Sequence, residues 1–125
     1  MKIFSLISVV FLSHNLAADL KVSLDQQIED LMPKVIEWRH DIHQYPELGN
    51  REFRTSKKIE DHLVSLGIPV ETKIAYTGLV GLIKGGKPGP TIALRADMDA
   101  LPVEEKTGLP YASKVRTTYL GNDVG

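Results

Sequence analysis

The spacing of apolar residues changes once along this chain, and that change limits the folds it can form. Up to Leu66, apolar side chains recur every three or four residues, as on one face of an α-helix. From Val70 to Ala96 they alternate with polar residues or form short continuous runs, as in β-strands. The sequence therefore predicts an α/β arrangement, with two helices followed by three strands.

A first helix is predicted over residues 19–45. Ser23 with Gln26 three residues later matches a capping box, which indicates a helix start at Ser23. Pro33 lies inside the pattern and predicts a kink rather than a break, because the apolar stripe keeps its phase across it. Pro46 predicts the end, because it disfavours the helical conformation of the preceding residue. The stripe consists of Leu24, Ile28, Leu31, Val35, Trp38 and Ile42.

A second helix is predicted to follow a short turn at residues 47–50. Asn50 is a plausible N-cap, Glu52 lies in the first turn, and Gly67 follows the last periodic residue as a C-terminal cap glycine does. The predicted buried side consists of Phe53, Ile59, Leu63 and Leu66.

Three strands are predicted after the second helix, over residues 70–74, 79–83 and 91–96. The third is apolar through its centre, which predicts burial on both faces. The glycine-rich segment 85–90 lies between two strands and does not open a helix, so it is interpreted as a hairpin loop and not as a phosphate site.

The first eighteen residues have the pattern of a secretory signal peptide. Lys2 gives a positive start, residues 3–12 are mostly apolar, and small residues follow up to the preferred cleavage point after Ala18, with Ala17 as the alternative. The apolar run is too short for a membrane span, which needs about 20 residues. The sequence therefore predicts export to a periplasm or medium, with residues 19–125 as the mature part.

Charge and cysteine content exclude several classes of protein. Fifteen Lys and Arg against sixteen Asp and Glu give a net charge of −1, which disfavours a basic nucleic-acid-binding protein. The chain has no Cys, which excludes a disulfide scaffold or a cysteine zinc site within these residues.

Two carboxylates, Asp97 and Asp99, directly follow the third predicted strand. Sites in open α/β sheets lie at the carboxyl ends of strands, and alternate residues of an extended chain point to one side. An Asp-x-Asp pair suits three chemistries: a phosphatase with an Asp nucleophile, a metal-dependent sugar transferase, and a metallo-amidohydrolase whose Asp orients a metal ligand. The structural alternative is a turn in which Asp97 accepts backbone hydrogen bonds.

Two histidines, His40 and His43, share one face of the first helix and could share a metal ion. The neighbouring acids Asp41 and Glu47 are not placed as obvious further ligands. A packed or hydrogen-bonded His43 at the helix end is therefore favoured. His62 is interpreted as an exposed or half-buried residue of the second helix.

Several long motifs resemble, in the right order, the zinc-peptidase-like amidohydrolases. That family includes hippurate hydrolases, N-acyl-amino-acid amidohydrolases and indoleacetyl-amino-acid hydrolases. The motifs occupy residues 38–49, 52–55, 77–81, 89–102 and 105–111.

The resemblance implies a phosphorylase/hydrolase-like α/β catalytic domain around a mixed sheet, with an inserted lid or dimerisation domain that these residues lack. It implies two divalent metal ions, usually zinc and sometimes manganese, cobalt or nickel. A metal-bound water would attack the amide of a small-molecule substrate while a Glu acts as general base. It also implies a homodimer or higher assembly, with no membrane span and no nucleic acid.

Carried over by position, Asp99 matches the Asp that orients a metal ligand. Asp97 stands where carboxypeptidase-like relatives have a metal-binding His, and in the hippurate-hydrolase branch that position is Asp, so its role stays open. The ligands of that branch come from a Cys-Gly-His-Asp segment, a Glu-Glu pair and two further His, all expected beyond Gly125. Glu104-Glu105 does not match that pair. The chain is thus predicted to be an N-terminal part of a hydrolase that is inactive alone, and the alternative is a non-catalytic truncated module.

Overall fold

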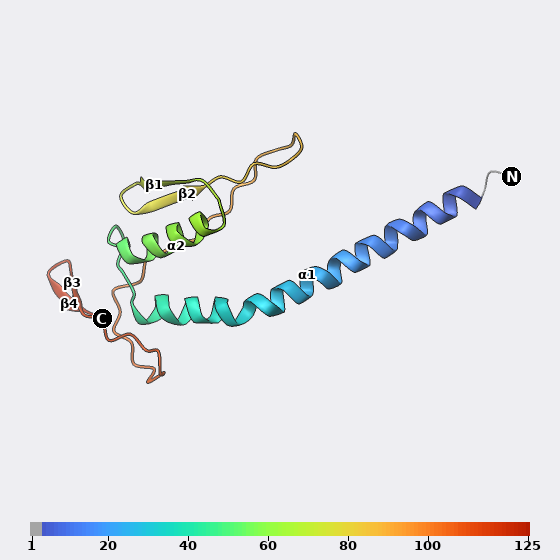
Figure 1. The fold of residues 1–125 in the computed structure, drawn as a ribbon. Helices are drawn as coiled ribbons and strands as arrows, with labels where there is room; N and C mark the ends of the chain where they lie inside the picture. Colours follow the sequence, from blue (N-terminus) through green and yellow to red (C-terminus); the bar gives the residue numbers. More distant parts are fainter. Residues whose placement is uncertain (1–3) are drawn as a thin grey trace. The chain divides into compact units, whose positions relative to one another are not determined.

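The computed structural model describes the backbone of residues 4–125 and the side chains from Lys21 onward. The chain is α/β, with six elements in the order α1 (Phe4–Gln44), α2 (Phe53–Ser65), β1 (Val70–Ile74), β2 (Gly78–Gly81), β3 (Thr117–Tyr119) and β4 (Asn122–Val124) (Figure 1). It divides into two compact units, one ending at Arg39 and the other beginning at His40. Each unit is described by itself.

Helix α1 starts earlier than the sequence predicts. The predicted start at Ser23 is wrong, because the helix passes through this residue without a cap. The Ser23 hydroxyl accepts a hydrogen bond from Gln27 Nε2 at 3.2 Å, and Gln26 Nε2 donates to Asp30 Oδ1 at 2.9 Å. The helix is unbroken at Pro33, and its predicted end before Pro46 is confirmed.

The predicted signal peptide, residues 1–18, is not tested by the structure. Its first three residues lie outside the described part, and of residues 4–18 only the helical backbone is described. In the described part of the chain, no helix is long and apolar enough to cross a lipid bilayer.

Helix α2 begins at a cap that comes from outside the helix. The predicted N-cap, Asn50, is wrong: this residue turns the chain at φ 62°, and Glu52 takes the cap position without a side-chain hydrogen bond to the helix. The carboxylate of Glu47 instead accepts the backbone N–H groups of Arg54 at 2.9 Å and Thr55 at 2.7 Å. A negative group at this end also interacts favourably with the helix dipole.

The end of α2 follows the predicted glycine cap. Gly67 adopts φ 72°, its N–H donates to the Val64 carbonyl at 2.9 Å, and the N–H of Ile68 donates to the Leu63 carbonyl at 3.0 Å. These two bonds form a Schellman motif. Of the four residues predicted to be buried, Ile59 and Leu63 are half-buried, whereas Phe53 and Leu66 are exposed.

Strands β1 and β2 form an antiparallel hairpin that packs against α2 (Figure 1). The hairpin turn spans residues 75–77, and Ala75 and Tyr76 both have positive φ. Gly78 is required next to this turn, because a β-carbon there would lie 2.5 Å from the Ile74 carbonyl oxygen. The first predicted strand is confirmed, and the second lies at residues 78–81 instead of 79–83.

The third predicted strand, Thr91–Ala96, is wrong as a structural element. The segment pairs with no other strand, and Ile92 and Leu94 are 80% and 96% exposed. A strand forms only where a neighbour accepts its backbone hydrogen bonds, and the described residues supply none here. The predicted mixed sheet is likewise replaced by two separate antiparallel pairs, of which β3–β4 was not anticipated.

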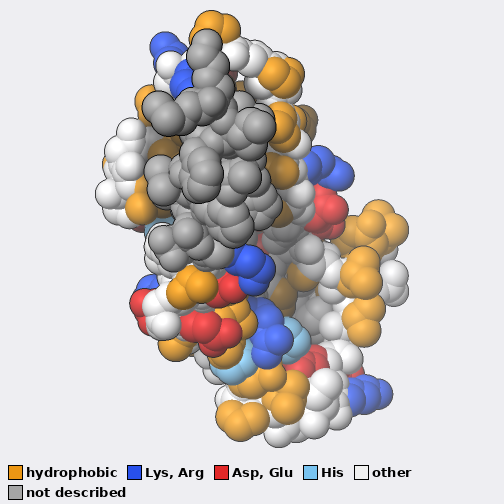
Figure 2. Space-filling model, turned by 90° about the vertical axis from the view of Figure 1, so that its right-hand side faces the viewer, with side chains coloured by type: hydrophobic (Ala, Val, Ile, Leu, Met, Phe, Trp, Pro, Cys, Tyr) orange, Lys and Arg blue, Asp and Glu red, His pale blue; other side chains and the backbone are white. Residues whose placement is uncertain are grey.

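Few side chains are buried in the described part of the chain. Leu48 is the one buried hydrophobic residue among residues 21–125, and the predicted stripe of α1 is exposed from Leu24 to Val35. Figure 2 shows hydrophobic side chains spread over the visible surface. The other buried side chains of the described residues are polar: Glu52, Thr55 and Thr77.

We expect a protein of residues 19–125 to self-associate through the unpaired segment 91–96, because exposed apolar strand-like edges pair with other chains. Sedimentation velocity should show a mean mass that rises with concentration. Leu94→Lys should shift it toward the monomer, whereas Lys87→Met in the neighbouring loop should not. A monomer with a cooperative thermal transition would contradict this expectation.

Candidate functional site

The Asp97–Asp99 motif and the turn after α1 meet in the structure. Ala100 forms a parallel bridge with Leu48, and its N–H donates to the Glu47 carbonyl at 2.8 Å. Asp99 is held against Gly49, where a β-carbon would lie 3.8 Å from Asp99 Oδ2. Two motifs about fifty residues apart therefore lie side by side, next to the buried Leu48.

A cavity of about 380 Å³ opens beside Asp99. Its polar side chains are two carboxylates, one histidine and two hydroxyls, and the remaining lining is mostly apolar. A mostly apolar cavity with a few convergent polar groups is the usual form of a small-molecule site. The polar lining residues are His43, Asp99, Glu105, Thr107 and Ser113.

Glu105 is the most heavily hydrogen-bonded carboxylate of this cavity. It accepts the Thr107 hydroxyl and, at 2.6 Å, the Ser113 backbone N–H, and its Oε2 lies 2.9 Å from His43 Nε2. These bonds, that of Thr107 foremost, lower the pKa of Glu105 from 4.5 to about 2. Glu105 is therefore ionised at neutral pH and attaches the loop after Asp99 to the end of α1.

The two histidines of α1 contact an aromatic ring instead of converging on a common point. His40 stacks on Tyr111 with 3.7 Å between ring centroids, and His43 meets the edge of the same ring at 5.5 Å. The hydrogen-bonded His43 that the sequence favours is confirmed. His62 is exposed, within the range that the sequence predicts.

Asp97 and Asp99 do not share the cavity. Both side chains are exposed, but Asp99 lines the cavity, whereas Asp97 does not and forms an ion pair with Arg95 at 2.6 Å. The expectation that both carboxylates face one site is wrong, because the segment is not a paired strand with regular alternation. Glu105, Tyr111 and Ser113 were missed as site residues. The turn signal Thr107-Gly108 could have indicated that this loop folds back.

A second carboxylate, Asp41, joins the end of α1 to α2. It accepts Arg54 Nη2 at 2.7 Å and Lys58 Nζ at 2.5 Å. The hydrogen bonds of Arg54 and then Lys58 lower the pKa of Asp41 below its usual range. These bonds hold the end of α1 close to α2, just before the turn that contains Glu47. The Glu47 carbonyl in turn accepts the N–H of Ala100, the residue after Asp99.

The described residues do not by themselves form a metal site. Among residues 21–125, no group of three or more His, Cys, Asp or Glu side chains is placed to hold a metal ion. Two-metal hydrolytic sites need several such ligands. The residues present therefore do not fit a metal pair.

The contacts of Glu105 predict a pH dependence. Its folded pKa of about 2 lies below the ordinary 4.5, so these contacts stabilise the loop above pH 4.5 and are lost as the pH falls toward 2. The protection factor of the Ser113 amide, its exchange rate compared with that of an unstructured chain at the same pH, should therefore fall over this interval. Glu105→Gln should abolish the change, and Glu104→Gln, at an exposed ion pair with Arg116, should preserve it. A Ser113 exchange profile with the same pH dependence in Glu105→Gln would refute this.

Comparison with known proteins gives a consistent set of relatives. No protein-family model matches the sequence. Thermostable carboxypeptidase 1 of Saccharolobus solfataricus is 48% identical over 99 residues, which are 78% of this chain and 25% of that protein. Hippurate hydrolase of Campylobacter jejuni is 45% identical over 93 residues, which are 74% of this chain and 24% of the relative.

A solved structure shares the fold of the matched part. The Bacillus subtilis YXEP protein, described as a dinuclear metal binding peptidase from the M20 family, superposes with a TM-score of 0.64 at 43% identity. The match covers 70% of this chain and 24% of that structure. The chain thus spans about a quarter of the length of the relatives it matches.

Proposed function

We propose, from the homology of this chain to the M20 family of metal-dependent amidohydrolases and peptidases, that it is part of an enzyme that hydrolyses amide bonds. The substrates proposed are N-acyl-amino acids or small peptide-like amides. The carrying observation is the identity of 45–48% to a carboxypeptidase and a hippurate hydrolase. Carboxypeptidases and hippurate hydrolases both cleave the carbonyl–nitrogen bond of an amide.

The geometry supports a positioning role for Asp99 in that reaction. Its backbone is fixed by the bridge between Ala100 and Leu48, and its carboxylate lines the 380 Å³ cavity. A carboxylate held in this way can orient a histidine ligand by accepting its second ring N–H. Asp97, exposed and paired with Arg95, lacks such support.

We also propose that the whole enzyme binds two divalent metal ions, with zinc as the first choice. The described residues do not fit such a pair, so its ligands would come from the three quarters of the relatives that this chain does not cover. The 125 residues alone are accordingly proposed to be inactive. The proposal also includes export through residues 1–18 and a homodimeric or higher assembly of the whole enzyme.

A chimaeric enzyme tests this function. The 99 residues that match thermostable carboxypeptidase 1 replace the corresponding segment of that protein. The chimaera should bind divalent metal and hydrolyse hippurate or another N-acyl-amino acid, and the 125-residue chain alone should show no turnover above background. A folded, metal-loaded chimaera without amide hydrolysis would contradict the proposal, as would hydrolysis by the chain alone. The nucleotide sequence after codon 125 distinguishes the two possibilities. An open reading frame that continues indicates a segment of an enzyme, and an immediate stop codon indicates a truncated module.

A further inference from the structure

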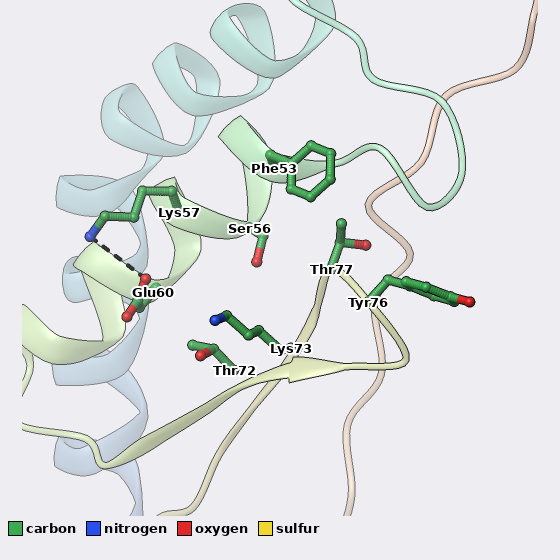
Figure 3. A pocket seen from close by; sticks show the side chains of 8 residues that line it. All are labelled: Phe53, Ser56, Lys57, Glu60, Thr72, Lys73, Tyr76 and Thr77. Carbon is green, nitrogen blue, oxygen red and sulfur yellow. Dashed lines mark ion pairs between the residues drawn. The ribbon is translucent and has the colours of Figure 1, made fainter.

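A second cavity, of about 370 Å³, lies between α2 and the β1–β2 hairpin (Figure 3). It belongs entirely to the second unit and shares no lining residue with the cavity beside Asp99. Helix α2 contributes Phe53 and Ser56 to its lining, and the hairpin contributes Thr72, Lys73 and Tyr76.

An irregularity of the hairpin places Lys73 in this cavity. Successive residues of a regular strand point to opposite faces, so Thr72 and Lys73 would not line the same space. Here the register shifts between Thr72 and Ile74, and Lys73 adopts φ 63°. Bulges of this kind redirect side chains, and strained non-glycine residues concentrate at functional sites.

One lysine of the lining is available to pair with an anion. Two lysines, Lys57 and Lys73, and one glutamate, Glu60, line the cavity. Lys57 lies 2.5 Å from Asp61 and 3.6 Å from Glu60, so its charge is compensated. Lys73 forms no ion pair with any described side chain. Figure 3 shows its ammonium group and the Ser56 hydroxyl both directed into the space between helix and hairpin.

Two aromatic side chains at the cavity are exposed to solvent. Phe53 is 68% exposed and Tyr76 is 78% exposed, and each contributes to the lining. Exposed aromatic side chains beside a polar pocket offer apolar surface to a ligand. A flat apolar group placed here would remove ring surface from water.

We infer that this cavity binds a small organic carboxylate that carries an aromatic ring. The carboxylate pairs with Lys73 and accepts the hydroxyls of Ser56 and Thr72, while the ring covers Phe53 and Tyr76. Each part of the ligand matches one part of the lining. The inference does not depend on the proposed amide hydrolysis.

Benzoate titrated into the full chain, followed by ligand-observed NMR, tests the inference. We expect saturable binding with a Kd of about 1–10 mM, as suits a ligand of this size. Lys73→Met should weaken binding about three- to tenfold, whereas Lys87→Met in the exposed loop should leave it unchanged. Benzamide, without charge, and acetate, without a ring, should both bind more weakly than benzoate.

Three results would overturn the inference: no saturable binding up to about 50 mM benzoate, equal binding of benzamide, or unchanged binding by Lys73→Met. Far-UV circular dichroism checks that each variant keeps the fold. If Lys73→Met perturbs the hairpin, Lys73→Arg, which keeps the charge, and Phe53→Ala, which removes the ring, supply the comparison. Retained binding in Lys73→Arg with loss in Phe53→Ala supports the inference, and any other pattern of these two overturns it.

Discussion

Asp99→Asn is expected to lower kcat/KM of the chimaeric hydrolase by about 10- to 100-fold, the usual cost of removing a carboxylate that orients a metal ligand. The asparagine keeps the shape and the neighbouring bridge between Ala100 and Leu48 but loses the negative charge. The measurement is the steady-state hydrolysis of an N-acyl-amino acid, with metal content determined on the same samples.

The matched control for Asp99 is Asp97→Asn. Asp97 lies two residues away, pairs with Arg95 and does not line the cavity, so its replacement should change kcat/KM less. If Asp97→Asn were the more damaging variant for amide hydrolysis, the assignment of Asp99 would be wrong. The phosphatase alternative has a separate readout, because Asp97→Asn would then abolish phosphatase turnover. A loss confined to stability, with kcat/KM intact at saturating metal, would also contradict the assignment.

Thr77→Val is expected to destabilise the second unit by about 1–3 kcal/mol, the cost of leaving a buried polar group without its partner. Thr77 and Glu52 are 6% and 7% exposed, and the Thr77 hydroxyl donates to Glu52 Oε2 at 2.5 Å. The urea midpoint, followed by far-UV circular dichroism, measures the loss. Thr91→Val, at an exposed position, serves as the control.

The pH dependence of this loss gives a second check. Burial opposes ionisation of Glu52, but the hydrogen bonds from Thr77 and the backbone outweigh it and lower its pKa. A depressed pKa contributes stability above the ordinary value of 4.5 that is lost in acid. The difference between Thr77→Val and the unsubstituted chain should therefore shrink below pH 4.5. A constant difference would show that the hydroxyl does not stabilise the ionised carboxylate.

Predictions that rested on short-range rules were mostly confirmed. The end of α1 before Pro46, the glycine cap at Gly67 and the strand at residues 70–74 depend on the conformational limits of proline, glycine and alternating side chains. The predicted start of α1 at Ser23 was wrong, because a capping box favours a helix start at its first residue without forcing one there. The residues before Ser23 also form helix.

Predictions that required knowledge of distant neighbours failed or were not made. Asn50 was a reasonable local cap for α2, yet the carboxylate of Glu47 reaches the helix from the preceding turn. Glu105 meets His43 across 62 residues of sequence. Residues 91–96 have strand composition, but the described residues offer no strand to pair with them.

The sequence by itself determined that two helices precede the first two strands and, through its motifs, the resemblance to amidohydrolases that the comparisons also found. Both follow from the identities of the residues and from their spacing along the chain. Only the tertiary structure decided that Asp99 and not Asp97 lines the cavity, that Glu105 binds His43, and that Lys73 faces α2. The physical reason is that a side chain's surroundings come from backbone turns and from partners remote in sequence, which no local pattern specifies.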